Sequence, residues 1–301
     1  MKVKKLQQVT NPDIKLLKIF KTVCECGSFT AAESLIGISR SAISLHMSDL
    51  EERVGFRLCQ RGRAGFSVTE EGQELLEYID VLLASIDDFR VQVNQIHNKF
   101  KGEFNIGIIN NLVTISNEHI TDALRQLSNE HPDVKINISM STLSDIESKV
   151  LDGRIHIGVI PFVTPLKGLE YIDLYEENSY LYCGNKHPLF SKKHLISLNE
   201  LKKYKAIMPN YNLPSDAIHL HQLLNTKASA TDREGIAFLI LTGNFLGFLP
   251  DHYAKKWVSE SQMVSLLESE MTYSTKICLI TKKTKSNNMI LKYFLSKIVL
   301  S

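Results

Sequence analysis

The sequence predicts an α/β protein in three parts: an N-terminal winged helix-turn-helix, a long coiled-coil linker helix and a C-terminal α/β domain. Glycine-separated helical patterns and a basic hairpin occupy residues 1–69. One apolar position recurs with a 3.5-residue period within residues 70–100, and strand and helix patterns alternate through residues 103–301. The chain has 301 residues, 44% hydrophobic and 23% charged, which suits a globular protein of two or three domains.

The first part contains the helix-turn-helix pattern. An apolar helix is followed by a second helix over residues 29–36, for which Ser28 is the expected N-cap. A tight turn at Gly37 separates it from a third helix, which begins at Ser39 and runs to about Val54.

A basic hairpin follows the third helix. Short extended runs at residues 57–61 and 66–68 flank the loop at residues 62–65 and predict the wing. Residues 1–70 hold 11 Lys and Arg against 7 Asp and Glu, a net charge of +4, whereas the whole chain carries only +2. A basic head on a nearly neutral body suits a polyanionic partner.

The outward face of the third helix and the tip of the wing are the candidate DNA contacts. A recognition helix places its N-terminal residues against base edges and phosphates in the major groove. Arg40 can bond guanine, Leu45 can contact a thymine methyl group, and basic wing residues suit phosphates or the minor groove. A generic three-helix domain with a polar face is the alternative. The candidate residues are Thr30, Ser39, Arg40, Ser41, Ser44, Leu45, Ser48, Arg61 and Arg63.

The linker helix is predicted to begin at the cap Thr69 and to tolerate Gly72 in its first turn. Its apolar positions alternate in steps of four and three, which indicates a left-handed coiled coil with a second chain. A helix packed on its own domain is the alternative interpretation. The predicted dimer seam comprises Leu75, Ile79, Leu82, Ile86, Phe89, Val93 and Ile96.

The third part begins with a strand–helix–strand–helix–strand pattern, the signature of a parallel sheet. Ligands of such sheets bind beyond the carboxyl ends of the strands and at helix N-termini. Polar residues at these positions are the candidate effector contacts, and ordinary capping is the alternative for each. The candidates are Asn110, Asn111, Thr114, Ser141, Thr142, Pro161, Phe162, Asn210, Ser215 and Thr231.

The sequence shows little sign of catalytic, metal-binding, disulfide or membrane-spanning segments. The sequence has no nucleotide-binding glycine motif, no hydrolase motif and no zincin motif, so we expect no enzyme activity, no cofactor and no metal. His219 and His221 are expected to be solvated loop histidines. Five cysteines make no disulfide framework, the start lacks a signal-peptide apolar region, and residues 235–250 are too short and polar to span a bilayer. These features predict a cytoplasmic protein without membrane contact.

The run SFTAAESLIGISRSAISLHMSDLEERVGFRLCQRGRAGFSVTEEG, residues 28–72, resembles the DNA-binding domain of LysR-type transcriptional regulators. KGEFNIGI, HPDVKINI, LDGRIHIGVI, the HPL at 187–189 and GNFLGFLP follow in the same order as in that family. The resemblance covers essentially the whole chain.

The resemblance implies a periplasmic-binding-protein-like effector domain of two Rossmann-like lobes, lobe I at 103–162 and 268–301 and lobe II at 163–267. It also implies a small, often anionic metabolite and a homodimer that usually assembles into a tetramer built from two dimers, and it admits RNA polymerase as a partner. Three positions depart from the family pattern: Ala32-Glu33 replaces an Ala-Ala pair, Arg40-Ser41 replaces Gln-Pro, and His156 replaces an Asp. Base preferences and roles are therefore not transferred to them.

Taken together, the sequence predicts a transcription regulator that binds double-stranded DNA and is controlled by a small-molecule effector. A ligand-independent repressor or architectural protein is one alternative, and it would have a filled cleft. An enzyme with a DNA-binding head is another, and it would have an acid–base pair in the cleft.

Overall fold

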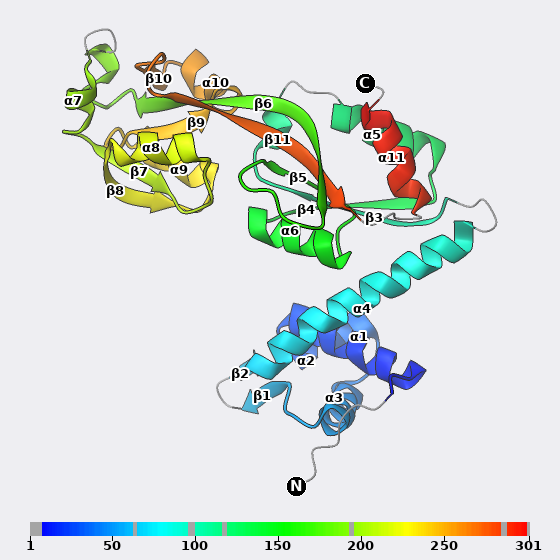
Figure 1. Ribbon diagram of the computed structural model, residues 1–301. Helices are drawn as coiled ribbons and strands as arrows, with labels where there is room; N and C mark the ends of the chain where they lie inside the picture. The colour runs from blue at the N-terminus through cyan, green and yellow to red at the C-terminus, as the bar shows by residue number, and fades with distance from the viewer. Residues whose placement is uncertain are drawn as a thin grey trace. The chain divides into compact units, whose positions relative to one another are not determined.

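The computed structural model describes residues 8–62, 65–95, 100–115, 119–192, 196–283 and 288–299. The chain forms two compact units, Met1–Ile86 and Asp87–Ser301 (Figure 1). No described helix combines the length and apolar character needed to cross a membrane.

The first unit is the predicted three-helix head with its wing, followed by the start of the linker helix. Each of the first three helices ends at a glycine in the left-handed region, with φ of 64° to 87°. Ser28 and Ser39 accept hydrogen bonds from the third residue beyond them, which confirms both predicted N-caps. The elements are α1 (Asn11–Cys26), α2 (Phe29–Ile36), α3 (Arg40–Val54), β1 (Cys59–Gly62), β2 (Gly65–Val68) and α4 (Glu70–Gln95).

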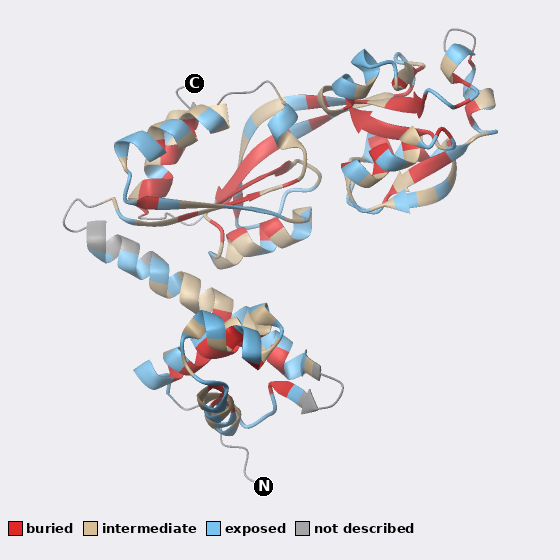
Figure 2. Cartoon of the chain, turned by 180° about the vertical axis from the view of Figure 1, so that it is seen from behind, coloured by how far each residue is buried: buried red, intermediate tan, exposed pale blue. Residues whose placement is uncertain are grey.

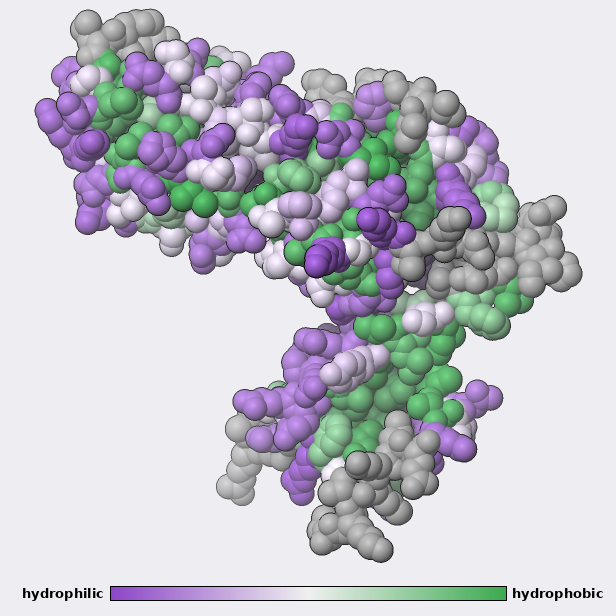
Figure 3. All heavy atoms as spheres, viewed as in Figure 1, coloured by the Kyte–Doolittle hydropathy of each residue, from purple (hydrophilic) through white to green (hydrophobic). Residues whose placement is uncertain are grey.

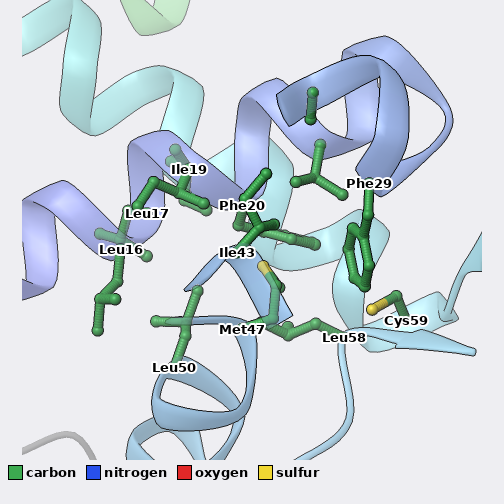
Figure 4. Close-up of a cluster of buried hydrophobic side chains, with 13 residues drawn as sticks. Leu16, Leu17, Ile19, Phe20, Phe29, Ile43, Met47, Leu50, Leu58 and Cys59 are labelled. Atoms are coloured by element: carbon green, nitrogen blue, oxygen red, sulfur yellow. The ribbon is translucent and has the colours of Figure 1, made fainter. Parts of the chain in front are cut away.

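Apolar side chains from all three helices make the core of the head (Figure 4). Phe20, Ile43 and Met47 are fully buried in it. Asp13 is also buried, and its carboxylate accepts hydrogen bonds from Thr10 and from Arg53, whose Nη1 lies 2.8 Å away. These bonds hold the pKa of Asp13 below its usual value, the Thr10 bonds contributing most and outweighing the opposing effect of burial.

Side-chain oxygens that accept from backbone amides hold the wing on the head and cap the linker helix. Glu51 on α3 accepts a hydrogen bond from the amide of Leu58 at 2.9 Å. Thr69 caps α4 by accepting from the amide of Gly72 at 3.0 Å, as predicted. A Cβ at residue 72 would lie 2.2 Å from the carbonyl oxygen of Leu58, so this position requires glycine rather than merely tolerating it.

The second unit is built on a mixed sheet with the order β10-β6-β11-β5-β3-β4, to which β9 adds beside β6. A smaller parallel pair joins β7 to β8. The strands are β3 (Gly102–Ile108), β4 (Val134–Met140), β5 (Ile157–Pro161), β6 (Leu169–Gly184), β7 (Lys205–Pro209), β8 (Asn225–Ala230), β9 (Gly247–Pro250), β10 (Met263–Leu266) and β11 (Thr272–Lys282). The α-helices are α5 (His119–Glu130), α6 (Leu143–Asp152), α7 (Leu198–Leu201), α8 (Ser215–Gln222), α9 (Arg233–Leu241), α10 (Asp251–Ser259) and α11 (Met289–Val299). Single 3₁₀ turns lie at η1 (Leu112–Thr114) and η2 (Phe190–Lys192).

Strands β6 and β11 connect two lobes. They pair antiparallel over their length, from Thr272 opposite Tyr180 to Lys282 opposite Leu169. Lobe I gathers β3, β4 and β5 with α5, α6 and α11, and lobe II gathers β7–β10 with α7–α10 (Figure 1). Figure 2 shows buried residues concentrated on the central strands.

The position where the chain passes between the lobes differs from the expected boundary at residue 163. Leu169, in the first half of β6, is buried in the lobe I core with Ile277 and Ile280. The second half of β6, including Leu181 and Cys183, is buried in lobe II. One continuous strand therefore serves both cores, and the lobes divide within β6 and β11.

Two buried histidines lie in lobe II. His221 is fully buried on α8 and not in a solvated loop, because its ring packs against Phe248 and its Nδ1 donates to the Ala217 carbonyl at 2.8 Å. His187 Nδ1 accepts from the amide of Leu189 at 3.1 Å, which requires that nitrogen to be unprotonated. Within the described residues neither Nε2 has a partner, and burial lowers the pKa of both rings.

We predict that the α/β unit loses stability as the pH falls below about 6.5. Both histidines have depressed folded-state pKa values, so the unfolded chain takes up protons first, and the stability present above the unfolded pKa is lost as the pH falls. Thermal unfolding between pH 8 and pH 5 should show a falling melting temperature. The shift should be about 2–4 °C for each kcal/mol lost.

Replacing both rings by His187→Gln and His221→Gln should flatten this pH dependence, while His219→Gln, on the exposed face of α8, should leave it unchanged. An equally steep pH dependence in the double variant would show that other groups cause the acid lability.

Candidate functional site

The predicted DNA-contact face lies at the N-terminal half of α3. Leu45 is 71% exposed, which is unusual for a leucine on a helix that packs into a core. Arg40 is exposed, and no carboxylate of the described residues lies within ion-pair distance of it. Ser44 is half-buried, and the other described candidates are exposed: Thr30, Ser39, Ser41 and Ser48.

Part of this face is used by the helix itself. Ser39 Oγ accepts from the amide of Ala42 at 3.3 Å and lies 2.9 Å from Ser41 Oγ. Ser48 Oγ donates to the carbonyl of Ser44 at 3.1 Å. These serines keep lone pairs for water or amino groups of bases, but Arg40 and Leu45 are the side chains of this face most available to a partner.

Only one of the two wing arginines lies within the described residues. Arg61 lies on β1, opposite Phe66 of β2. Arg63 falls outside the described residues. The hairpin itself is present as predicted, with Cys59 paired to Val68.

The seam predicted along α4 divides into two halves. Ile79 is 1% exposed because it packs into the head core of its own chain, and Leu75 and Leu82 pack partly on the same core. Ile79 therefore has no surface left for a second chain, which corrects its assignment to the seam. The alternative, a helix packed on its own domain, applies to this half.

The second half of the stripe remains open to a partner. Phe89 is 64% exposed, Val93 is 41% exposed and Ile86 is half-buried. Ile96 lies outside the described residues. Figure 3 shows apolar side chains gathered over α4 on the face in view.

A cavity of about 550 Å³ lies between the lobes at the carboxyl ends of the strands. Lobe I contributes the ends of β3, β4 and β5 with the N-terminus of α6, and lobe II contributes the ends of β7 and β8 with the N-terminus of α9. Six of the ten candidate effector contacts line it: Asn110, Ser141, Thr142, Pro161, Asn210 and Thr231.

The other four candidates lie elsewhere. Asn111 adopts a left-handed conformation with φ of 66°, and its buried Nδ2 has no partner in the described structure. Thr114 faces His252, and the Phe162 ring contacts Tyr171 edge-on at 5.4 Å. Ser215 is exposed on the first turn of α8. These four do not line this cavity: Phe162 directly follows β5 but turns toward Tyr171, and the other three lie three to six residues past the ends of their strands.

Several lining residues were not predicted, and Arg233 matters most among them. It is only 9% exposed, and its guanidinium forms a two-fold ion pair with Glu177 on β6, with Nη1 3.0 Å from Oε2. The same carboxylate accepts from His252 Nε2 at 2.8 Å, and His252 Nδ1 lies 2.6 Å from Thr114 Oγ1 of lobe I. The other missed residues are Ile109, Met140, Leu143, Ser144, Tyr211, Asn212 and Asp232.

Glu177 is the buried centre of this network, at 3% exposed. Burial alone would raise its pKa, but the His252 bond and the charge of Arg233 outweigh burial and hold the pKa below its usual value. The carboxylate is therefore charged at neutral pH and keeps Arg233 in the cavity wall.

Comparison with known proteins identifies both units. Residues 14–73 match the family model "Bacterial regulatory helix-turn-helix protein, lysR family", and residues 97–297 match the model "LysR substrate binding domain". The chain belongs to the LysR family of transcription regulators. The chain is thus a DNA-binding regulator with an effector-binding domain, and the predicted fold class is confirmed. Its family is one of regulators and not of enzymes.

Individual relatives cover most of the chain. The HTH-type transcriptional activator BauR of Pseudomonas aeruginosa is 51% identical over 98% of this chain and 97% of its own length. The SDS degradation transcriptional activation protein of a Pseudomonas species is 25% identical over 84% of this chain and 78% of its own. Among solved structures, the LysR family regulator CbnR is 19% identical and covers 95% of this chain and 98% of its own, with a TM-score of 0.68.

Proposed function

We propose that this LysR-family regulator is a dimeric, cytoplasmic transcription activator that responds to a small anionic metabolite. The exposed face of α3, with Arg40 and Leu45 uncommitted to the fold, is the observation that carries its DNA contact. The proposal that it activates transcription rests on BauR, a relative 51% identical in sequence that is named an activator.

The cavity favours an effector over ligand-independent regulation. A filled cleft would suit an architectural protein, whereas a hollow of about 550 Å³ has room for a metabolite. The amides of the first turn of α6, the hydroxyl of Ser144 and the guanidinium of Arg233 favour a negatively charged group there. The described acid of this wall, Asp232, caps α9, and Glu177 behind Arg233 is held in its ion pair, which disfavours an acid–base enzyme.

The DNA contact can be tested at Arg40. We predict that Arg40→Ala weakens binding about 10- to 100-fold to a duplex site selected with the unaltered protein, because a base-contacting arginine contributes about 1–3 kcal/mol. The matched control is Arg125→Ala, which removes an exposed arginine of α5. Fluorescence anisotropy over a salt series measures both, and equal affinities of the two variants would refute the placement of α3 on DNA.

Dimerisation can be tested on the open half of α4. We predict that Phe89→Lys converts the dimer to a monomer in sedimentation velocity, because it places two like charges in an apolar seam. Glu77→Lys, on the far side of the helix, should leave the dimer intact. A dimer of unchanged stability in the Phe89 variant would move the interface off this stripe.

Effector sensing can be tested at the two threonines of the cavity. A metabolite panel is first screened for ligands that raise the melting temperature of the full chain. Thr142→Val and Thr231→Val should then each raise the ligand concentration needed for half-maximal response by up to about tenfold, since one hydrogen bond contributes about 0.5–1.5 kcal/mol.

Thr142 also caps α6 through its 3.4 Å contact with the amide of Asp145, so Thr142→Ser, which keeps the hydroxyl, is the control for lost capping. Parent-like titration by both valine variants would place the effector outside this cavity.

A further inference from the structure

The effector domain has a second hollow that shares no described lining residue with the effector cavity. It measures about 840 Å³ and lies where the second half of β6 meets α10 and β10, with Thr114 of lobe I at one side. We call it the tyrosine groove, because Tyr175, Tyr180 and Tyr182 all line it.

Tyr182 is a buried residue in the wall of this groove. The residue is only 4% exposed, yet its hydroxyl is not enclosed by protein and has no hydrogen-bond partner among the described residues. Tyr180 lies two residues earlier on the same strand and therefore on the same face. The Tyr182 ring packs in the lobe II core, so the groove combines the partly exposed ring of Tyr180 with the hydroxyl of Tyr182.

The charges around the groove are unbalanced. Three carboxylates line it, and each accepts from a neutral donor. Glu176 accepts from the Ser274 hydroxyl at 3.5 Å, and Asp251 accepts from the His252 amide at 2.6 Å. Glu268 accepts from the Ser265 hydroxyl. No lysine or arginine of the described structure pairs with these three carboxylates. Among the described lining residues Lys255 is the one lysine or arginine. The fourth acid, Glu177, is already neutralised by Arg233.

The pKa of Tyr182 agrees with this field. Burial raises it, and the negative charges of Asp251 and Glu268 raise it further. The hydroxyl therefore stays neutral and can accept a hydrogen bond from a cationic donor.

We propose that the tyrosine groove binds a small organic cation with protonated amino groups. Aromatic faces attract such cations when they are partly removed from water, and carboxylates accept charge-assisted hydrogen bonds from ammonium groups. The hydroxyl of Tyr182 supplies an acceptor at the buried end. A metal ion is disfavoured, because no cluster of three or more suitable ligands occurs among the described residues.

Glu177 connects the wall of the groove to the wall of the effector cavity through its hydrogen bonds. Glu177 accepts from His252, which lines the groove, and from Arg233, which lines the cavity. A cation in the groove would be attracted by the Glu177 carboxylate, which also holds Arg233 in place. Binding in the groove can therefore change the affinity of the effector cavity for its ligand. By linkage, such an influence is equal in both directions.

The probe for the test is 1,4-diaminobutane, titrated into the full-length protein by calorimetry at constant ionic strength. We expect saturable binding, and none with 1,4-butanediol or succinate at the same concentrations. Glu268→Gln and Glu176→Gln should each weaken the affinity, and Tyr182→Phe should weaken it by about 2- to 13-fold through loss of one hydrogen bond. Glu170→Gln removes an exposed acid of the same strand outside the groove and should leave the affinity unchanged.

The proposal is overturned if the diamine does not bind, if the groove variants bind it as the parent does, or if Glu170→Gln weakens binding equally. It is also overturned if magnesium chloride gives the same saturable binding with the same loss in the variants. Thr142→Val should bind the diamine like the parent, and DNA affinity is measured separately. Failure of this site is therefore distinguishable from failure of the regulator assignment.

Discussion

The effector domain depends on the antiparallel pairing of β6 with β11. This pair runs continuously from Leu169 opposite Lys282 to Tyr180 opposite Thr272, so each strand contributes to the core of both lobes. Strand β5 joins it on the lobe I side, and β9 and β10 extend it on the lobe II side. The cavity and the tyrosine groove both exist because two cores are built on one ribbon. A register shift between Ile277 and Cys278 interrupts the regular pairing on the lobe I side.

Glu177 places a charge in the middle of that ribbon. An isolated buried carboxylate would be costly, and this one is tolerated because a guanidinium and an imidazole both donate to it. Such a network adds little net stability, but removing one member leaves the others uncompensated. Its value lies in geometry, because it fixes Arg233 toward one hollow and His252 toward the other. The arrangement joins Thr114 of lobe I to His252 of lobe II by a polar contact.

Local signals in the sequence were sufficient for the helices of the head and the strands of the sheet. Capping serines and terminal glycines act within a few residues, and strand ends at Asn110, Ser141 and Asn210 locate a cleft by topology alone. Arg233 could not be assigned in this way, because its partner lies 56 positions earlier in the chain. His221 stands in a polar-looking segment, and only the packing of Phe248 around it makes it a core residue. The close approach of Leu58 to Gly72 is likewise invisible until the wing is folded.

The stripe on α4 shows that a periodic pattern specifies a face but not what covers it. Its first half completes the head of its own chain through Ile79, while its second half, including Phe89, is left exposed. The same repeat would therefore give unlike mutant classes in a genetic screen. Polar substitutions near Ile79 would unfold the head and be recovered as proteolysed, recessive losses. Substitutions near Phe89 would leave a folded subunit that fails to assemble. Only the substitutions near Phe89 would be rescued by a second subunit that carries the opposite charge at the same position. A search for suppressor mutations would therefore identify the second half of the stripe and miss the first half.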